Sequence, residues 1–121
     1  MVIKPVEEFE RVETLDVFFD ELFKLYNKSE EEKKKYMKFL FAELHKIENR
    51  TEKSYRAEPI CYKGIKLYSI RKRMKKNTRV LYYYKKDDRV LLVTAFDENN
   101  ESDYENAKER AYRRLKTLDL I

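Results

Sequence analysis

Three arginines have the spacing that would let them act together on a phosphate group. Arg71 and Arg73 lie two residues apart in a segment with strand character, so their side chains share one face. Arg79 follows after a short turn, on what we expect to be the neighbouring strand, and can reach the same region. Planar guanidinium groups match the oxygens of a phosphate in pairs. The pattern predicts phosphate neutralisation; the alternative is an exposed sheet face that binds nothing.

Cleavage of RNA by its own 2′-hydroxyl would also need a proton acceptor and a proton donor. His45 is the only histidine of the chain, which excludes a mechanism with two histidines. Tyr104, Tyr82 or Tyr68 can transfer protons if nearby cations lower a tyrosine pKa that is ordinarily about 10. Asp97 or Glu98 can act as a base if either carboxylate lies near the arginines. For the tyrosines, packing in the core is the competing role.

The arginines belong to a strongly basic stretch. The 28 residues from Pro59 to Lys86 include ten Lys or Arg and no Asp or Glu. Residues 61–96 carry 11 basic and 2 acidic side chains, although the net charge of the whole chain is only +5. Because clustered like charges repel one another, a polyanion such as RNA is the simplest reason for them, and a solvated face without a partner is the alternative. The residues that we expect to bind RNA are Lys66, Lys72, Arg73, Lys75 and Lys76.

The composition predicts a single domain over residues 1–121, because 42% hydrophobic residues are enough for one core. No segment approaches the roughly 20 apolar residues that a membrane span needs, and no apolar signal region opens the chain, so the expected location is the cytoplasm. Cys61 is the only cysteine, which excludes an internal disulfide. No convincing pattern of metal ligands appears, and neither a metal nor another cofactor is expected.

Apolar periodicity predicts two helices in the first half of the chain. Over residues 15–26, apolar side chains recur with the spacing of one helical face, and Thr14 is a suitable N-cap. Ser29, with Glu32 three residues later, has the pattern of a capping box that opens a second amphipathic helix. The short connection between them predicts an antiparallel helical hairpin over about residues 14–48.

The second half changes to the alternation that is typical of strands. Segments 66–74, 79–85 and 90–96 are separated by short polar turns, and the last segment is the most apolar. Three consecutive strands of this kind predict an antiparallel meander. A further short strand is expected over residues 2–6, and the polar residues 49–58 predict a loop.

A final helix is expected over about residues 102–117, opened by a capping box of Ser102 and Glu105. The order of these elements predicts an α+β fold. In that fold an N-terminal antiparallel helical hairpin packs on a small, mainly antiparallel sheet over about residues 64–96, and a C-terminal helix follows.

Four segments occur in an order that is known from one family. They read GIKLYSIR over residues 64–71, TRVLYY over 78–83, LLVTAF over 91–96 and YENA over 104–107. In this order they resemble the RelE/HigB superfamily of toxins from type II toxin–antitoxin pairs. The resemblance covers residues 64 to about 111, and the expected helical hairpin and sheet suit the RelE-like fold.

The resemblance implies a ribosome-dependent mRNA endonuclease that a cognate antitoxin silences. Its partners would be that antitoxin, mRNA and the ribosome. Arg71 matches the arginine that ends the family's first strand motif, and Arg79 matches the arginine that contacts the scissile phosphate in nucleolytic members. Tyr104 matches a tyrosine near the start of the last helix that acts in catalysis in some members. These three residues are therefore the candidate catalytic residues.

The sequence departs from the family after the apolar strand. Where the family usually has basic residues, Phe96 is followed here by Asp97, Glu98 and Asn99. This departure favours a second hypothesis, a catalytically silent member of the fold that binds nucleic acid or a protein target such as gyrase. A purely structural or oligomerisation role is the third hypothesis, and it depends only on the amphipathic helices.

Overall fold

The computed structural model describes residues 1–49 and 59–121. In chain order its elements are β1 (Ile3–Pro5), β2 (Val12–Leu15), α1 (Asp16–Leu25), α2 (Glu30–Glu48), β3 (Ile60–Tyr62), β4 (Ile65–Arg73), β5 (Asn77–Tyr84), β6 (Val90–Asp97) and α3 (Glu101–Thr117). The loop expected over residues 49–58 falls, apart from Asn49, outside the described residues.

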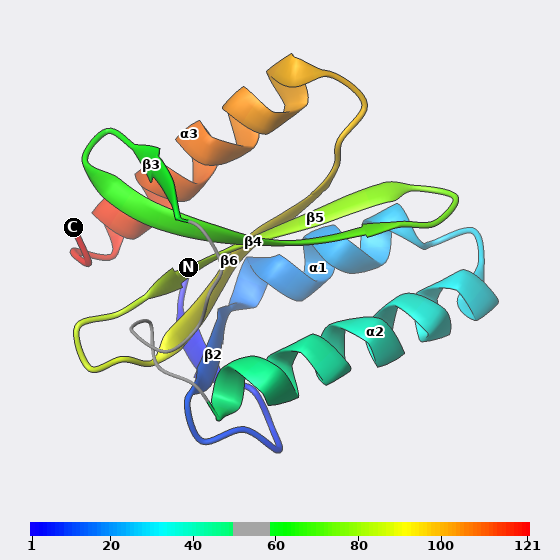
Figure 1. The fold of residues 1–121 in the computed structure, drawn as a ribbon, viewed down its shortest axis with the longest axis horizontal. Coiled ribbons are helices and arrows are strands. Elements are labelled where there is room, and N and C mark those ends of the chain that lie inside the picture. The colour runs from blue at the N-terminus through cyan, green and yellow to red at the C-terminus, as the bar shows by residue number, and fades with distance from the viewer. Residues whose placement is uncertain (50–58) are drawn as a thin grey trace.

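The strands form one six-stranded sheet in the order β1-β2-β6-β5-β4-β3. Neighbouring strands are antiparallel except β2 and β6, which run parallel. Helices α1 and α2 lie on one face of the sheet and α3 lies on the other (Figure 1). Strands β4, β5 and β6 pair as the antiparallel meander that their alternation predicted.

The fold class expected from the sequence is wrong. The chain does not begin with a helical hairpin, because β1 and β2 precede α1 and α2, and the sheet is mixed. Residues 12–14 of β2 pair in parallel with residues 90–92 of β6, far along the chain. Strands of three or four residues are too short to show a convincing alternation, and a parallel partner so distant in sequence leaves no local signal.

The short strand expected over residues 2–6 is present as β1, and the start of α1 shows why β2 was missed. Thr14, the expected N-cap, lies buried in β2, and its hydroxyl donates to the carbonyl oxygen of Leu15 at 2.9 Å. Leu15 is the residue before the helix and makes no side-chain cap. The second helix begins as predicted, since the Ser29 hydroxyl accepts a hydrogen bond from the backbone N–H of Glu32 at 3.2 Å.

The last helix begins slightly earlier than expected, at Glu101. Its capping box is formed by Asn100 and Asp103, not by Ser102 and Glu105. The Asn100 side chain accepts from the backbone N–H of Asp103 at 3.1 Å, and the Asp103 carboxylate accepts from the backbone N–H of Asn100 at 3.2 Å. Asn and Asp thus satisfy the free N–H groups that open α3.

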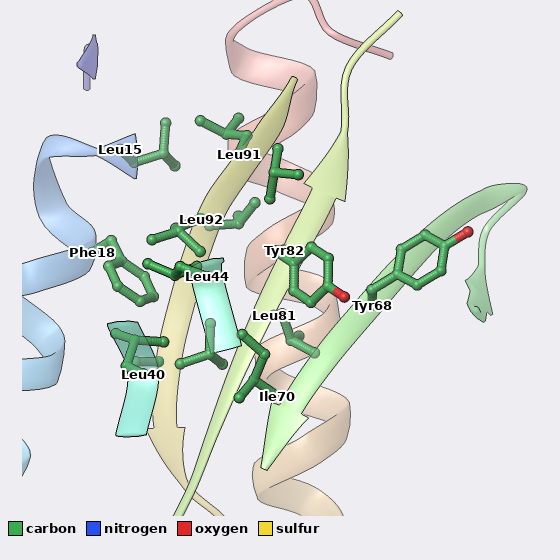
Figure 2. Packing of buried hydrophobic residues seen from close by; sticks show 14 of the residues in the cluster. Leu15, Phe18, Leu40, Leu44, Tyr68, Ile70, Leu81, Tyr82, Leu91 and Leu92 are labelled. Carbon is green, nitrogen blue, oxygen red and sulfur yellow. The ribbon is translucent and has the colours of Figure 1, made fainter. Parts of the chain in front are cut away.

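The larger part of the core lies between the sheet and helices α1 and α2. Figure 2 shows this packing of buried side chains, with Leu15, Phe18, Leu40 and Leu44 next to Ile70, Tyr82 and Leu92 of the sheet. On the other face, α3 packs through three fully buried residues, Ala107, Ala111 and Leu115. Because two of the three are alanines, the helix can approach the sheet closely.

Candidate functional site

Arg79 lies at the centre of a polar cluster between the sheet and the start of α3. Strand β5 places it opposite Arg71 on β4 and Phe96 on β6, on the face that α3 covers. Only 13% of its side chain is exposed. Its Nη2 donates to Glu98 Oε1 at 2.8 Å, and its Nη1 donates to Ser69 Oγ at 3.2 Å. Hydrogen bonds to two different strands or loops therefore fix the orientation of the guanidinium.

Tyr104 approaches this guanidinium from the first turn of α3. The central carbon of the Arg79 guanidinium lies 4.3 Å from the centroid of the tyrosine ring, and Nη1 lies 3.5 Å from the tyrosine hydroxyl. The ring also contacts Phe96 edge-on at a centroid distance of 5.9 Å, and the ammonium of Lys108 lies 4.9 Å from it. Two cations and one aromatic ring thus surround Tyr104.

Asn77 connects the second arginine to the same carboxylate. Arg71 Nε donates to Asn77 Oδ1 at 3.2 Å, and Asn77 Nδ2 donates to the carbonyl oxygen of Glu98 at 3.0 Å. The side chain of Glu98 is only 16% exposed, with the Asn77 amide and the Arg79 guanidinium beside it. We call this group the Arg79 cluster: Ser69, Arg71, Asn77, Arg79, Glu98 and Tyr104.

The Arg79 cluster contains the groups that phosphodiester chemistry needs. Arg71 and Arg79 face each other in register, and like charges directly opposite one another destabilise a strand pair, so an anion near both is favourable. Glu98 supplies one such anion in the free protein. The Nε of Arg79 is buried and has no hydrogen-bond partner among the residues that the structure describes. The catalytic candidates Arg71, Arg79 and Tyr104 therefore lie together, and their roles remain predictions.

Part of the expected RNA-binding set lies elsewhere. Lys72, Arg73 and Lys75 line a hollow of about 490 Å³ between the β4–β5 hairpin and α2. Helix α2 contributes Lys35 and Phe39 to it, and the ammonium of Lys72 lies 5.0 Å from the centroid of the Phe39 ring. Lys72 and its neighbour Arg71 lie on opposite sides of the sheet, as alternation requires, so the basic stretch is divided. Arg73 lines the hollow with Lys72, although the sequence predicted that it shares the face of Arg71.

The two remaining lysines of that set are also outside the Arg79 cluster. Lys66 is exposed and lines a separate hollow with Tyr68 and Tyr84. Lys76 lies in the β4–β5 turn, with its ammonium 3.9 Å from a carboxylate oxygen of Asp97. The structure therefore does not gather all of the predicted RNA-binding residues at one place.

Beyond Tyr104, which was predicted, sequence reasoning missed the side chains that extend the cluster along α3. Tyr104, Lys108, Tyr112 and Lys116 are spaced four residues apart, which places them along one side of the helix. The alternation of Tyr and Lys is visible in the sequence, but the apolar stripe of the same helix obscures it. Asn77 was missed for another reason, since its contact with Glu98 depends on the register of β5 and β6.

Two further observations apply to residues 1–49 and 59–121 alone. No three His, Cys, Asp or Glu side chains in these ranges are grouped so that they could hold a metal ion. None of the helices there combines the length and the apolar character that crossing a bilayer requires.

Comparison with protein families gives a match over most of the chain. Residues 26–116 match the family described as Phage derived protein Gp49-like (DUF891), and this range contains every member of the Arg79 cluster. No curated protein matches the sequence significantly. The matched family is part of the RelE/HigB-like toxin–antitoxin family, which suggests a cognate antitoxin as a partner. The chain therefore belongs to the phage-derived Gp49-like family, and this membership supports a toxin of a toxin–antitoxin pair.

Proposed function

We propose that this protein is the toxin of a type II toxin–antitoxin pair that binds RNA and cuts mRNA on the ribosome. The Arg79 cluster carries the proposal, because two arginines, a carboxylate and a tyrosine meet there on one face of the sheet. Membership of the family supports the toxin role, and the resemblance to RelE/HigB toxins is the reason for including the ribosome. Residues 1–121 would act as one domain in the cytoplasm.

In the proposed reaction, the scissile phosphate binds beside Arg71 and Arg79. Glu98 accepts the proton of the 2′-hydroxyl, whose oxygen attacks phosphorus while the bond to the 5′-oxygen breaks. Tyr104 donates its hydroxyl proton to the leaving 5′-oxygen and takes a proton back from solvent. The products are a 2′,3′-cyclic phosphate and a 5′-hydroxyl. The two guanidinium groups stabilise the negative charge that develops on the phosphate oxygens.

Expression of the chain in cells without its antitoxin tests this proposal. We expect growth arrest and cleaved mRNA, with both lost in Arg79→Ala, because removing one group that stabilises transition-state charge costs about 10²- to 10³-fold in rate. Arg89→Ala is the matched control, since Arg89 is 51% exposed and lies just before β6, at the other end of that strand from Phe96. Mapping of mRNA 5′ ends measures the cleavage. Arrest and cleavage that persist unchanged in Arg79→Ala contradict the proposal.

The ion pair between Arg79 and Glu98 also favours a second candidate function, a catalytically silent member that binds nucleic acid or a protein such as gyrase. Both partners are mostly buried, and a phosphate has to compete with the carboxylate. Purified protein that binds RNA but cuts none, even on programmed ribosomes, would decide for this candidate. With about five phosphate contacts, the logarithm of the affinity should fall by about 3.5 for each decade of salt.

A further inference from the structure

A row of alternating aromatic rings and cations continues from the Arg79 cluster along α3. We call it the tyrosine–lysine ladder; its members are Tyr104, Lys108, Tyr112 and Lys116 of α3, and Tyr62 and Lys63 at the end of β3. Strand β3 lies beside α3 in the fold (Figure 1), so residues far apart in the sequence form one row. Tyr104 belongs to both groups and joins the ladder to the Arg79 cluster.

In the first half of the ladder, one lysine contacts two tyrosine rings. The ammonium of Lys108 lies 4.9 Å from the centroid of the Tyr104 ring and 5.7 Å from the centroid of the Tyr62 ring. Both distances are within the range of cation–π contacts. Lys108 therefore bridges a ring on α3 and a ring on β3.

The second half depends on the turn between β3 and β4. Lys63 and Gly64 both have positive φ, 48° and 83°, as the two-residue turn of a tight hairpin requires. The ammonium of Lys63 lies 5.5 Å from the Tyr62 ring centroid and 5.0 Å from that of Tyr112. Lys116 ends the row, 5.8 Å from the Tyr112 centroid. Each neighbouring pair is thus in contact along the whole ladder.

Two carboxylates accompany the ladder without cancelling its charge. Glu109 lies 2.9 Å from Lys63 and 3.1 Å from Arg113, and Glu105 lies 2.6 Å from Lys108. Three cations pair with these two carboxylates, and Lys116 at the end of the ladder is a fourth cation beside the Tyr112 ring. The surface therefore keeps a surplus of positive charge beside three half-buried tyrosine rings.

We propose that the tyrosine–lysine ladder binds single-stranded RNA adjacent to the phosphate held by the Arg79 cluster. Bases stack on aromatic rings and phosphates bind cations, which is the combination that single-stranded sites use. From Tyr104 to Lys116, α3 rises about 18 Å, which corresponds to about five bases at a stacked spacing of 3.4 Å. The choice of RNA rests on the proposed function, whereas the binding itself does not require cleavage.

Binding requires the ladder to open. A lysine has a flexible stem and can move its ammonium from a ring to a phosphate, which leaves the ring free for a base. Lys63 and Lys116 are exposed, and a cation–π contact at an exposed position is weaker than base stacking on the same ring, so the exchange at these two lysines is favourable. The free protein therefore holds the rings in place until a single strand replaces the lysines.

The experiment measures fluorescence anisotropy with a labelled, unpaired 12-mer of 2′-O-methyl RNA, which binds but cannot be cut through its 2′-hydroxyl. We expect Tyr112→Leu to weaken binding by about 5- to 100-fold with an unchanged salt slope, because it removes stacking and no charge. Lys63→Gln and Lys116→Gln should each reduce the salt slope by about 0.7. A hairpin RNA of equal charge should bind wild type and Tyr112→Leu equally, because its bases are already paired.

Matched controls come from a cation–π pair outside the ladder. Lys33 lies 4.2 Å from the Phe23 ring, so Lys33→Gln and Phe23→Leu make the same chemical changes elsewhere and should leave binding unchanged. Unchanged affinity in Tyr112→Leu, together with unchanged salt slopes in both lysine variants, overturns the ladder. The same anisotropy assay with a labelled poly-glutamate peptide gives a second test. If the variants weaken binding of the peptide but not of the RNA, the ladder proposal is overturned and the surface is assigned to an acidic protein. If Tyr112→Leu does not fold, the salt slopes of Lys63→Gln and Lys116→Gln test the ladder: reduced slopes support it and unchanged slopes overturn it.

Cleavage of unmodified RNA on ribosomes separates this inference from the proposed function. Binding through the ladder without any cleavage supports the ladder and contradicts the nuclease. If Arg79→Ala abolishes cleavage but the ladder variants bind RNA as tightly as wild type, the ladder is contradicted and the nuclease is not. An absence of any RNA binding contradicts both.

Discussion

The ion pair between Arg79 and Glu98 stabilises the free protein but opposes phosphate binding in the proposed reaction. In the free protein it neutralises an arginine that is 13% exposed and faces another arginine across the strand pair. During RNA binding the same carboxylate competes with the incoming phosphate for the guanidinium. After binding, a carboxylate at this position can accept a proton. One substitution separates these roles, because Glu and Gln have the same shape.

We expect Glu98→Gln to lower single-turnover cleavage by about 10²- to 10⁴-fold, because the general base is lost. The same change should tighten binding of the 2′-O-methyl 12-mer, since Arg79 no longer shares its donors with an anion. Anisotropy and cleavage of a labelled RNA measure the two effects. Asp97→Asn is the control, since Asp97 accepts from the backbone N–H of Asn77 at 3.0 Å and should change cleavage only a few-fold. Full cleavage by Glu98→Gln would place the base elsewhere.

The carboxylate of Glu109 contributes to the free energy of unfolding, and this contribution decreases in acid. The ammonium of Lys63, then the Tyr62 hydroxyl and the Arg113 guanidinium, donate to its carboxylate and lower its pKa from 4.5 to about 2. Between these values the unfolded chain binds more protons than the folded one. The contribution is therefore complete above about pH 4.5 and is lost as the pH falls towards 2.

Thermal unfolding between pH 2 and pH 7 checks this expectation. Wild type should lose melting temperature steeply below pH 4.5, and Glu109→Gln should show a shallower loss because its side chain does not titrate. Glu101→Gln, an exposed position in the first turn of α3, should keep the wild-type slope. Identical slopes for wild type and Glu109→Gln would rule out this carboxylate as the source.

At the scale of elements, α3 positions both Tyr104 and the tyrosine–lysine ladder, so its first turn matters most. The turn is held by the reciprocal bonds of Asn100 and Asp103. Tyr104 directly follows Asp103, and the contact between the tyrosine ring and the Arg79 guanidinium depends on this turn being closed. Fraying at the N-terminus of α3 would therefore loosen the Arg79 cluster.

We expect Asn100→Ala to lower the free energy of unfolding by about 1 kcal/mol, the usual cost of removing an N-cap side chain. Ser102→Ala should change it by less than about 0.5 kcal/mol, because Ser102 lies on the surface and its hydroxyl only donates to Asn100 Oδ1, which keeps its bond from the N–H of Asp103. Urea unfolding of the two variants provides the comparison. A larger loss in Ser102→Ala than in Asn100→Ala would mean that the cap had been assigned to the wrong residue.

At the scale of the whole molecule, Glu21 links the helices that cover opposite faces of the sheet. Its carboxylate pairs with both terminal nitrogens of Arg114, at 2.7 and 2.9 Å, and accepts from the Thr94 hydroxyl at 3.0 Å. Arg114 also donates to the carbonyl oxygen of Val93 at 2.9 Å. Strand β2 pairs with β6 only up to Leu92, so this network satisfies the edge of β6 beyond that point.

We expect Glu21→Gln to lower the free energy of unfolding by about 2 kcal/mol, because the change leaves a mostly buried arginine without its counter-charge. The side chains of Glu21 and Arg114 are 25% and 16% exposed, so solvent screens part of the full cost of breaking a buried pair. The control is Glu31→Gln, whose exposed pair with Lys35 should contribute less than about 0.5 kcal/mol. Equal urea midpoints for the two variants would contradict the role of Glu21 as a link.

Several features could be predicted from the sequence because their signals are local. Ser29 caps α2 as expected, although the reciprocal bond from Glu32 is not formed, and the meander of β4, β5 and β6 follows from alternation. The short turn between their strands also predicted that Arg71 and Arg79 reach one region, and the register of β4 and β5 places them opposite each other. The misplaced capping box of α3 shows the limit, since two overlapping patterns competed and only the backbone geometry selected Asn100.

Periodicity, charge and capping signals alone thus predicted the three helices, the central strands and the arginine-rich segment that forms β4 and β5. The tertiary structure decided the parallel pairing of β2 with β6, the contact of Glu98 with Arg79, and the meeting of Tyr62 and Lys63 with α3. The physical reason is distance along the chain. A repeat in hydrophobicity is present in neighbouring residues, whereas a contact between remote short segments exists only after the whole core has set their registers.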